Sequence, residues 1–515
     1  MRAAGLALLV VAVLAAAARW GSFVAGGSDS FCYLHQAERW ASGRLQVVEP
    51  LALQMPWPNA PLSFAPAGHV PSSTVPGAIV PICPAGLSIL MAFAVLLGGS
   101  GAALIVVPLC GAVLLLATAV VGGRFSPRVG VVAAALLACS PVFLYQVFQP
   151  MSDVPAAAFW MLAVAWATGT SRRAGVAAGL AAGVAILIRP NLVPLGVVLG
   201  LFLLLRPERR WRQRLTMAAQ YATGCALGCV AVAAIQQHFY GSPFSSGYGP
   251  LTVLFAMDHV APNLSRYLAW TWETHTPFIA VALLAPLVLP GPMTALVIAW
   301  TAVNLALYVP YVVFDDWSAL RFLLPSIPLW LVLAVATTEG LVRRLIAVDP
   351  RATRARQAAV TVGISVAVAV VAAAMLRQAS DRQTFHLRDL EARFRRAGTF
   401  AASRLPANAV VIASVHSGSV RYYAGRVTLV WDQLDPAWLQ RAVAELTSRG
   451  RAPVFLFEAG EEAPFRARFG QDGTSPLARL DWPPMAEVAS LVRAYVPGDR
   501  DRYLQGQTRP TEYVP

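Results

Sequence analysis

The sequence contains no lysine and few charged residues of any kind. Arginine supplies all 40 basic residues, charged residues make up 13% of the 515 residues, and hydrophobic residues make up 57%. An ordinary soluble protein carries about a quarter charged residues, so this composition excludes a soluble globular chain and predicts a polytopic membrane protein. The net charge of +14 does not indicate nucleic acid, because many arginines lie in short loops between apolar runs, as membrane topology and anionic headgroups favour.

The motifs of common soluble enzymes are also missing. The sequence has no GxGxxG after a strand, no Walker A motif, no HExxH and no GxSxG. Their absence excludes the usual nucleotide, zinc-protease and serine-hydrolase sites. The sequence therefore requires no cofactor, and no cluster has diagnostic metal-ligand spacing. A divalent cation held between Asp29 and Asp153 is the alternative that stays open.

Apolar runs of roughly spanning length recur along the first 377 residues. A helix needs about 20 apolar residues to cross a bilayer. The first run, about 3–24, has this length, which favours a retained span over a cleaved signal peptide. With it, eleven spans are predicted. The other ten runs lie near residues 101–121, 129–148, 154–170, 173–190, 191–205, 215–236, 276–290, 292–313, 321–341 and 357–377.

One further apolar run, 83–97, is short and contains Pro84. If this run does not cross, 15 arginines lie on one face of the membrane, which the positive-inside rule makes cytoplasmic. We therefore predict a re-entrant or interfacial helix there, with the N-terminus in the cytoplasm of a bacterial inner membrane. Most acids of the membrane part then face outward and indicate an outer polar site. They are Asp29, Glu38, Glu49, Asp153, Asp258, Glu273, Asp315 and Asp316.

Two long outer loops follow from this topology, at about 25–82 and 237–275. Cys32 and Cys83 lie in or beside the first loop, where they can pair, and the other four cysteines lie in apolar runs. From residue 379 the composition changes, and short β-like runs, at 409–413, 427–431 and 454–457, alternate with helical stretches. We predict a transmembrane domain over 1–378 and a small α/β domain over 379–515. The odd number of spans places the second domain outside the cytoplasm.

Asp29 and Asp153 are the leading candidates for chemistry. Each stands at the outer end of a predicted span, where an acid is costly without a partner or a function. Asp29 can act as a general base or cap the helix that begins beside it. Asp153 is open to the same two interpretations, and two such acids can converge on one pocket.

Arg189 and Arg321 are candidates for binding a phosphate, because the guanidinium fork matches phosphate oxygens. The alternatives are headgroup snorkelling for Arg189 and a salt bridge with Asp315 or Asp316 for Arg321. Weaker candidates for substrate binding also lie on the outer side. They are Tyr33, Tyr248, Glu273 and Asp316.

Several short motifs, in this order and on this side of the membrane, resemble the GT-C superfamily of polytopic glycosyltransferases. The nearest branch contains the bacterial relatives of dolichyl-phosphate-mannose protein mannosyltransferases and the aminoarabinose transferases. The resemblance covers about residues 1–377. A single Asp29 stands where many relatives have paired acids, and Cys83 stands where an aromatic residue is frequent. The motifs are Asp29 after the first span, Pro81 to Gly86, Met151-Ser152-Asp153, Ile188-Arg189-Pro190 and Leu320 to Pro325.

This resemblance implies a sugar donor carried on a polyprenyl phosphate and an acceptor outside the cytoplasm, which is a protein, a glycolipid or a polysaccharide. It implies that Asp29, with Asp153, orients the acceptor for attack with inversion, while Arg189 and Arg321 stabilise the leaving phosphate. Two alternatives stay open. One is a lipid-linked saccharide flippase without catalysis, and the other is an envelope assembly protein.

Overall fold

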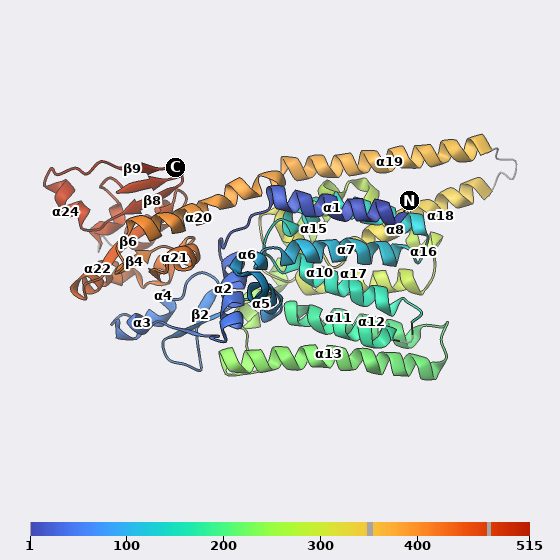
Figure 1. The fold of residues 1–515 in the computed structure, drawn as a ribbon, viewed down its shortest axis with the longest axis horizontal. Helices are drawn as coiled ribbons and strands as arrows, with labels where there is room; N and C mark the ends of the chain where they lie inside the picture. Colours follow the sequence, from blue (N-terminus) through green and yellow to red (C-terminus); the bar gives the residue numbers. More distant parts are fainter. Residues whose placement is uncertain (1, 172, 348–353, 471–474) are drawn as a thin grey trace.

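The computed structural model describes residues 2–171, 173–347, 354–470 and 475–515. Long helices lie side by side, and a sheet formed by C-terminal residues stands at one end of them (Figure 1). The N-terminus lies at the opposite end. Between the helices and the sheet are α2 (Asp29–Ser42) and α5 (Ala85–Gly98).

Among the described residues, four helical segments are long and apolar enough to cross a membrane, or six if each of two bent pairs forms one span. The predicted number of eleven spans stays a prediction. The four segments are α1 (Arg2–Trp20), Ser100–Gly122 with α7 (Val106–Gly122), α13 (Trp211–Tyr240) and α19 (Arg354–Asp381). The bent pairs are α8 (Pro127–Ala138) with α9 (Pro141–Val147), and η4 (Trp317–Leu323) with α18 (Ile327–Ala347).

The helical part also contains α15 (Val260–His275) and several shorter apolar helices. The run at 83–97 forms α5, which packs against α2. The predicted single run at 129–148 is instead bent by 64°, because Ser140 caps a new helix and Pro141 opens it. The remaining short helices are α10 (Asp153–Ala167), α11 (Ala174–Ile188), α12 (Val193–Leu205), η3 (Pro277–Leu284) with α16 (Ala285–Val288), and α17 (Pro292–Tyr308).

Glycines set the contact between α11 and α13. A Cβ added at Gly224 would lie 2.2 Å from the carbonyl carbon of Gly179, and one at Gly228 would lie 2.5 Å from the carbonyl oxygen of Gly183. Small residues allow membrane helices to approach backbone to backbone. This contact fixes α11, and α11 ends directly before Arg189.

We expect Gly224→Val to destabilise the protein by about 1–3 kcal/mol or more, because the new side chain meets rigid backbone. Thermal unfolding in detergent measures the loss. Gly363→Val on α19 is the matched control, since no atom lies within 4 Å of a Cβ added there. Equal unfolding temperatures for the two variants would contradict the packing role of Gly224.

The C-terminal residues form a six-stranded sheet in the order β5-β4-β6-β8-β7-β9. The first three of these neighbours are parallel, and β6, β8 and β7 are antiparallel. Strands lie where the sequence predicted them, near 409–413, 427–431 and 454–457. The strands are β4 (Ala409–Ile412), β5 (Val427–Leu429), β6 (Ala452–Glu458), β7 (Ala486–Val488), β8 (Val492–Tyr495) and β9 (Glu512–Val514). The helices beside them are α20 (Leu387–Arg404), α21 (Ser417–Ala424), α22 (Leu439–Ser448), α23 (Glu462–Gly470) and α24 (Asp499–Leu504).

The core of this sheet includes residues of the first outer loop. Trp57 and Phe64 belong to the same buried cluster as Trp431 and Phe455. They lie beside the short helices α3 (Pro50–Gln54) and α4 (Ala60–Ser63), and the same loop also forms β1 (Val47–Val48), β2 (His69–Pro71) and β3 (Ala78–Pro81). The buried pair of Arg421 and Glu49, 3.2 Å apart, joins loop and sheet. The loop therefore packs as part of the C-terminal core.

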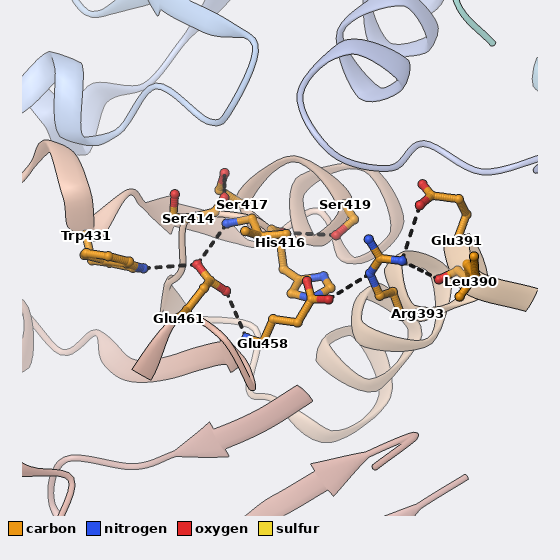
Figure 2. Close-up of polar contacts among 11 residues, drawn as sticks. Leu390, Glu391, Arg393, Ser414, His416, Ser417, Ser419, Trp431, Glu458 and Glu461 are labelled. Carbon is orange, nitrogen blue, oxygen red and sulfur yellow. Dashed lines mark hydrogen bonds and ion pairs between the residues drawn. The ribbon is translucent and has the colours of Figure 1, made fainter. Parts of the chain in front are cut away.

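A partly buried polar cluster ties α20 to the sheet (Figure 2). Arg393 contacts Glu458 at 2.9 Å and Glu391 at 3.3 Å. His416 is fully buried, and its Nε2 lies 3.6 Å from a carboxylate oxygen of Glu458. Burial, with the nearby Arg393 charge, lowers the pKa of His416 to about 3, so the ring is neutral at neutral pH. This cluster fixes the orientation of α20, one face of which contacts the segment between α1 and α2.

Candidate functional site

A cavity of about 950 Å³ opens where α2 and the helical bundle meet. Aromatic side chains form much of its wall, with a few convergent polar groups, which is the usual character of a ligand site. Five of the predicted site residues line it together. They are Asp29, Tyr33, Arg189, Tyr248 and Arg321.

Asp29 is the first residue of α2, and its side chain is about one-third exposed. Ser28 occupies the capping position but makes no side-chain capping bond. The carboxylate of Asp29 instead lies 3.5 Å from the Arg321 guanidinium. A carboxylate in a first helical turn is also favoured by the helix dipole. The site therefore presents Asp29 to the cavity.

Arg189 lies in the break between α11 and the 3-10 turn η1 (Pro190–Leu192). Its guanidinium lies 2.9 Å from Asp153, whose side chain is fully buried. It also donates hydrogen bonds to Ser152 at 3.1 Å and to Tyr308 at 3.4 Å. A buried charge is tolerated when it is paired in this way. Asp153 thus lies behind Arg189 and is not among the residues that line the cavity.

The two arginines meet at one aromatic ring. The guanidinium carbon of Arg321 lies 5.2 Å from the centre of the Phe322 ring, and that of Arg189 lies 5.6 Å from it. The Nε of Arg321 is buried and has no hydrogen-bond partner among the described residues. Two guanidinium cations at one wall can bind a phosphate together.

Local sequence explains why these groups converge. A Cβ added at Gly86 would lie 2.4 Å from the backbone nitrogen of Ile188, so glycine lets the start of α5 touch the end of α11. Pro190 then ends the helix and leaves Arg189 at the cavity.

Cys32 and Cys83 form a disulfide, which ties α2 to the segment before α5. The sequence had left this pairing open.

Other candidates lie elsewhere. Glu273 pairs with Arg382 at 2.5 Å, and Asp316 accepts a hydrogen bond from the backbone of Ser318 at 2.8 Å. Neither residue lines the cavity. The alternative salt bridge of Arg321 with Asp315 or Asp316 is not formed, since Arg321 contacts Asp29 and Asp315 contacts Arg266.

Ser152, Asn191 and Tyr308 are among the polar residues of the wall that sequence reasoning missed. Ser152 receives a hydrogen bond from Tyr33 at 2.9 Å, and Tyr308 receives one from Asn191 at 2.7 Å. Ser152 and Asn191 each neighbour a predicted site residue, which was a usable signal, whereas Tyr308 ends an apolar run and gives none. Over the described ranges, no group of three or more His, Cys, Asp or Glu side chains could hold a metal ion.

The segment that precedes Asp29 is held by residues of the C-terminal part of the chain. Arg395 donates to the carbonyl of Phe23, and the backbone of Ala25 donates to the hydroxyl of Tyr423 at 2.8 Å. A Cβ added at Gly26 would lie 2.5 Å from the ring of Phe394. That ring is buried against His416 at 5.1 Å. Residues of α20 and α21 therefore fix the approach to Asp29.

The fold has counterparts among known proteins. Residues 81–235 match the family model described as dolichyl-phosphate-mannose-protein mannosyltransferase, and no curated protein matches the chain in sequence. Two solved structures of ArnT from Cupriavidus metallidurans cover 99% of this chain at 14% identity. The one bound to undecaprenyl phosphate has a TM-score of 0.56, with 99% of its own length covered, and the apo form has 0.59, with 100% covered.

A third structure, a mutant of the arabinofuranosyltransferase AftD from Mycobacteria, matches with a TM-score of 0.51 at 15% identity. It covers 88% of this chain, which spans only 36% of the AftD chain. At such low identities, the structural similarity shows a shared fold alone. The resemblance predicted from the sequence is confirmed: the chain has the GT-C fold and resembles the protein mannosyltransferases and aminoarabinose transferases of that superfamily.

Proposed function

We propose that this protein is a membrane glycosyltransferase that moves a sugar from a polyprenyl-phosphate donor to an extracytoplasmic acceptor with inversion. The observation that carries the proposal is the cavity in which one carboxylate, Asp29, faces two arginines, Arg189 and Arg321. ArnT, which has the same fold, has been solved with undecaprenyl phosphate bound, and this supports a lipid phosphate as the group that the arginines meet.

In the proposed reaction, side chains of the protein take up the proton and stabilise the leaving group. The acceptor hydroxyl gives its proton to Asp29 and attacks the anomeric carbon, forming the new glycosidic bond. The bond between the anomeric carbon and the phosphate oxygen breaks, and its electron pair leaves with the polyprenyl phosphate. Arg189 and Arg321 stabilise the charge that develops on that phosphate. When the phosphate engages Arg321, the carboxylate of Asp29 is released from its ion pair.

Asp153 acts through Arg189 in this proposal. Its carboxylate, buried and 2.9 Å from the guanidinium, fixes the position of Arg189 and balances its charge. It is therefore a positioning residue. Two tyrosines add hydrogen bonds that help to hold Arg189. Tyr33 donates one to Ser152, and Tyr308 accepts one from Arg189.

We place the cavity on the outer face of a bacterial inner membrane. The elements that line it, with α2 and α5 among them, lie at the end of the helices opposite the N-terminus. The connection between α12 and α13, which is rich in arginine, lies at the N-terminal end (Figure 1). Positive loops favour the cytoplasm. The Cys32–Cys83 disulfide supports this orientation, because disulfides persist in oxidising compartments.

Purified full-length protein incubated with a polyprenyl-phosphate sugar and membrane-derived acceptor tests the proposal. We expect release of free polyprenyl phosphate together with glycosylated acceptor. A flippase would move the donor across the bilayer of a proteoliposome and release none. Transport without release would therefore replace the proposed activity by that alternative.

The contact between Gly26 and Phe394 predicts that C-terminal residues help to position Asp29. We expect Gly26→Val to lower kcat by about 10–100-fold with little change in donor KM, because the new side chain displaces Asp29 relative to bound donor. Steady-state kinetics measure both constants. Gly5→Val on α1 is the control, with no atom within 4 Å of an added Cβ. A rise in KM alone would argue against this positioning role.

A further inference from the structure

Three guanidinium groups from two separate connections meet at the C-terminal end of α10. Arg206 donates hydrogen bonds to the carbonyls of Ala167 and Gly169, at 2.7 and 3.2 Å. Arg209 donates to the same Gly169 carbonyl at 3.2 Å. Arg124, which lies between α7 and α8, donates to a carbonyl in the last turn of α10 at 3.3 Å. We call Arg124, Arg206 and Arg209 the arginine cluster.

The arginine cluster lies far from the cavity. Two of its members belong to the connection between α12 and α13, which is at the N-terminal end of the helices (Figure 1). The elements that line the cavity, α2 and α5 among them, are at the other end. None of the three arginines lines the cavity, so the proposed reaction gives them no role.

Capping of α10 does not require three arginines. The C-terminal end of a helix carries about half a negative charge, which one guanidinium offsets. The three connections that meet here, at 123–126, 168–173 and 206–210, contain one acid, Glu208. It pairs with Arg206 at 3.3 Å. Arg124 and Arg209 form no ion pair with any residue of the described ranges, so positive charge is left over at this end of α10.

The side chains that flank the α12–α13 connection are exposed and apolar or basic. Leu205 is 72% exposed and Trp211 is 65% exposed. Arg210 and Arg212 stand on either side of Trp211 and are exposed as well. Tryptophan is enriched where a membrane meets water. The connection therefore borders the bilayer at the level of the headgroups.

We infer that the arginine cluster binds the headgroup phosphate of an anionic phospholipid, at the membrane face opposite the cavity. Guanidinium forks match phosphate oxygens, and the α10 carbonyls hold three of them toward one place before any ligand arrives. Basic pockets between membrane helices suit acidic headgroups. The acyl chains of a phospholipid also cover Leu205 and Trp211, which a soluble phosphate leaves exposed. The inference is independent of the proposed reaction.

Thermal unfolding of the purified full-length protein in a zwitterionic detergent tests the inference, because a ligand of the folded state raises the unfolding temperature as its concentration rises. We expect saturable stabilisation by phosphatidylglycerol. Phosphatidylcholine with the same acyl chains should give none, and neither should glycerol phosphate, which has the phosphate without the chains. Equal stabilisation by phosphatidylcholine would overturn the role of charge, and equal stabilisation by glycerol phosphate would overturn the lipid assignment.

Variants locate the binding site. Arg209→Gln should weaken the apparent affinity for phosphatidylglycerol by about tenfold, because it removes one charge-assisted contact with the phosphate. Arg124→Gln, in the other connection, should have the same effect, so misfolding of one variant leaves the other as the test. Unchanged affinity in the folded variants would overturn the inference.

Arg343→Gln is the matched control. Arg343 lies on α18 near the same connection, since its partner Glu339 also accepts a hydrogen bond from Ser126. Because the charge of Arg343 is balanced by Glu339, this variant should bind phosphatidylglycerol like the wild type. A loss as large as that of Arg209→Gln would mean a general attraction between the basic face and the lipid, and it would overturn the specific site.

Discussion

Replacing Asp29 by asparagine should lower turnover by about 10²–10⁴-fold, the usual contribution of a general base. Asparagine keeps the shape of the side chain but cannot take up the proton of the acceptor hydroxyl. The fold should be unaffected, because the ion pair with Arg321 is partly exposed, with about one-third of the Asp29 side chain accessible. Exposed pairs contribute about 0–1 kcal/mol to stability.

Asp315→Asn is the control for this variant. Asp315 is another acid that pairs with an arginine, Arg266 at 2.7 Å, but its side chain is almost fully exposed and does not line the cavity. Turnover of this control should match the wild type. Near wild-type turnover of Asp29→Asn, at an unchanged unfolding temperature, would remove Asp29 from the mechanism.

Replacing Arg189 by glutamine should have a second large effect, on both stability and turnover. The change leaves the Asp153 carboxylate buried without its cationic partner, at a cost of about 3–5 kcal/mol. It also removes one of the two cations proposed to stabilise the leaving phosphate. Thermal unfolding and the rate of polyprenyl phosphate release measure the two losses separately.

The double variant Arg189→Gln with Asp153→Asn separates positioning from catalysis. Removing both charges should restore much of the unfolding temperature, since no unpaired charge is then buried. Turnover should stay low, because the phosphate has lost Arg189. Recovery of turnover along with stability would mean that Arg189 serves the fold alone.

The sequence indicated the membrane class, the fold and five of the residues that line the cavity. Asp29, Arg189 and Arg321 could be predicted because each interrupts or borders an apolar run, where a charge is costly. Their meeting in one cavity depends on the close approach of Gly86 to Ile188 and on the break at Pro190. Such contacts join distant segments and leave no periodic trace in the sequence.

The partners of these charges could not be predicted in the same way. Spacing along the chain favoured Asp315 or Asp316 for Arg321, but the contact is with Asp29, nearly 300 residues away. The sequence also left both Asp29 and Asp153 open to either a functional role or a helix cap. Burial separates them, since Asp29 faces the cavity and Asp153 lies behind Arg189.

The boundary of the C-terminal domain shows a similar limit of local patterns. Composition changes near residue 379, which predicted a separate unit. The first outer loop nevertheless supplies Trp57 and Phe64 to its core. These residues precede the sheet by some 350 positions, so only the folded chain reveals that the loop and the sheet are packed together.

A density map of the protein with polyprenyl phosphate bound tests the central claim most directly, because the claim is that one cavity holds the leaving phosphate opposite Asp29. The account predicts phosphate oxygens within hydrogen-bonding distance of both Arg189 and Arg321, with the Asp29 carboxylate released from Arg321. Phosphate density at another place, with the Asp29–Arg321 and Asp153–Arg189 pairs intact, would contradict it.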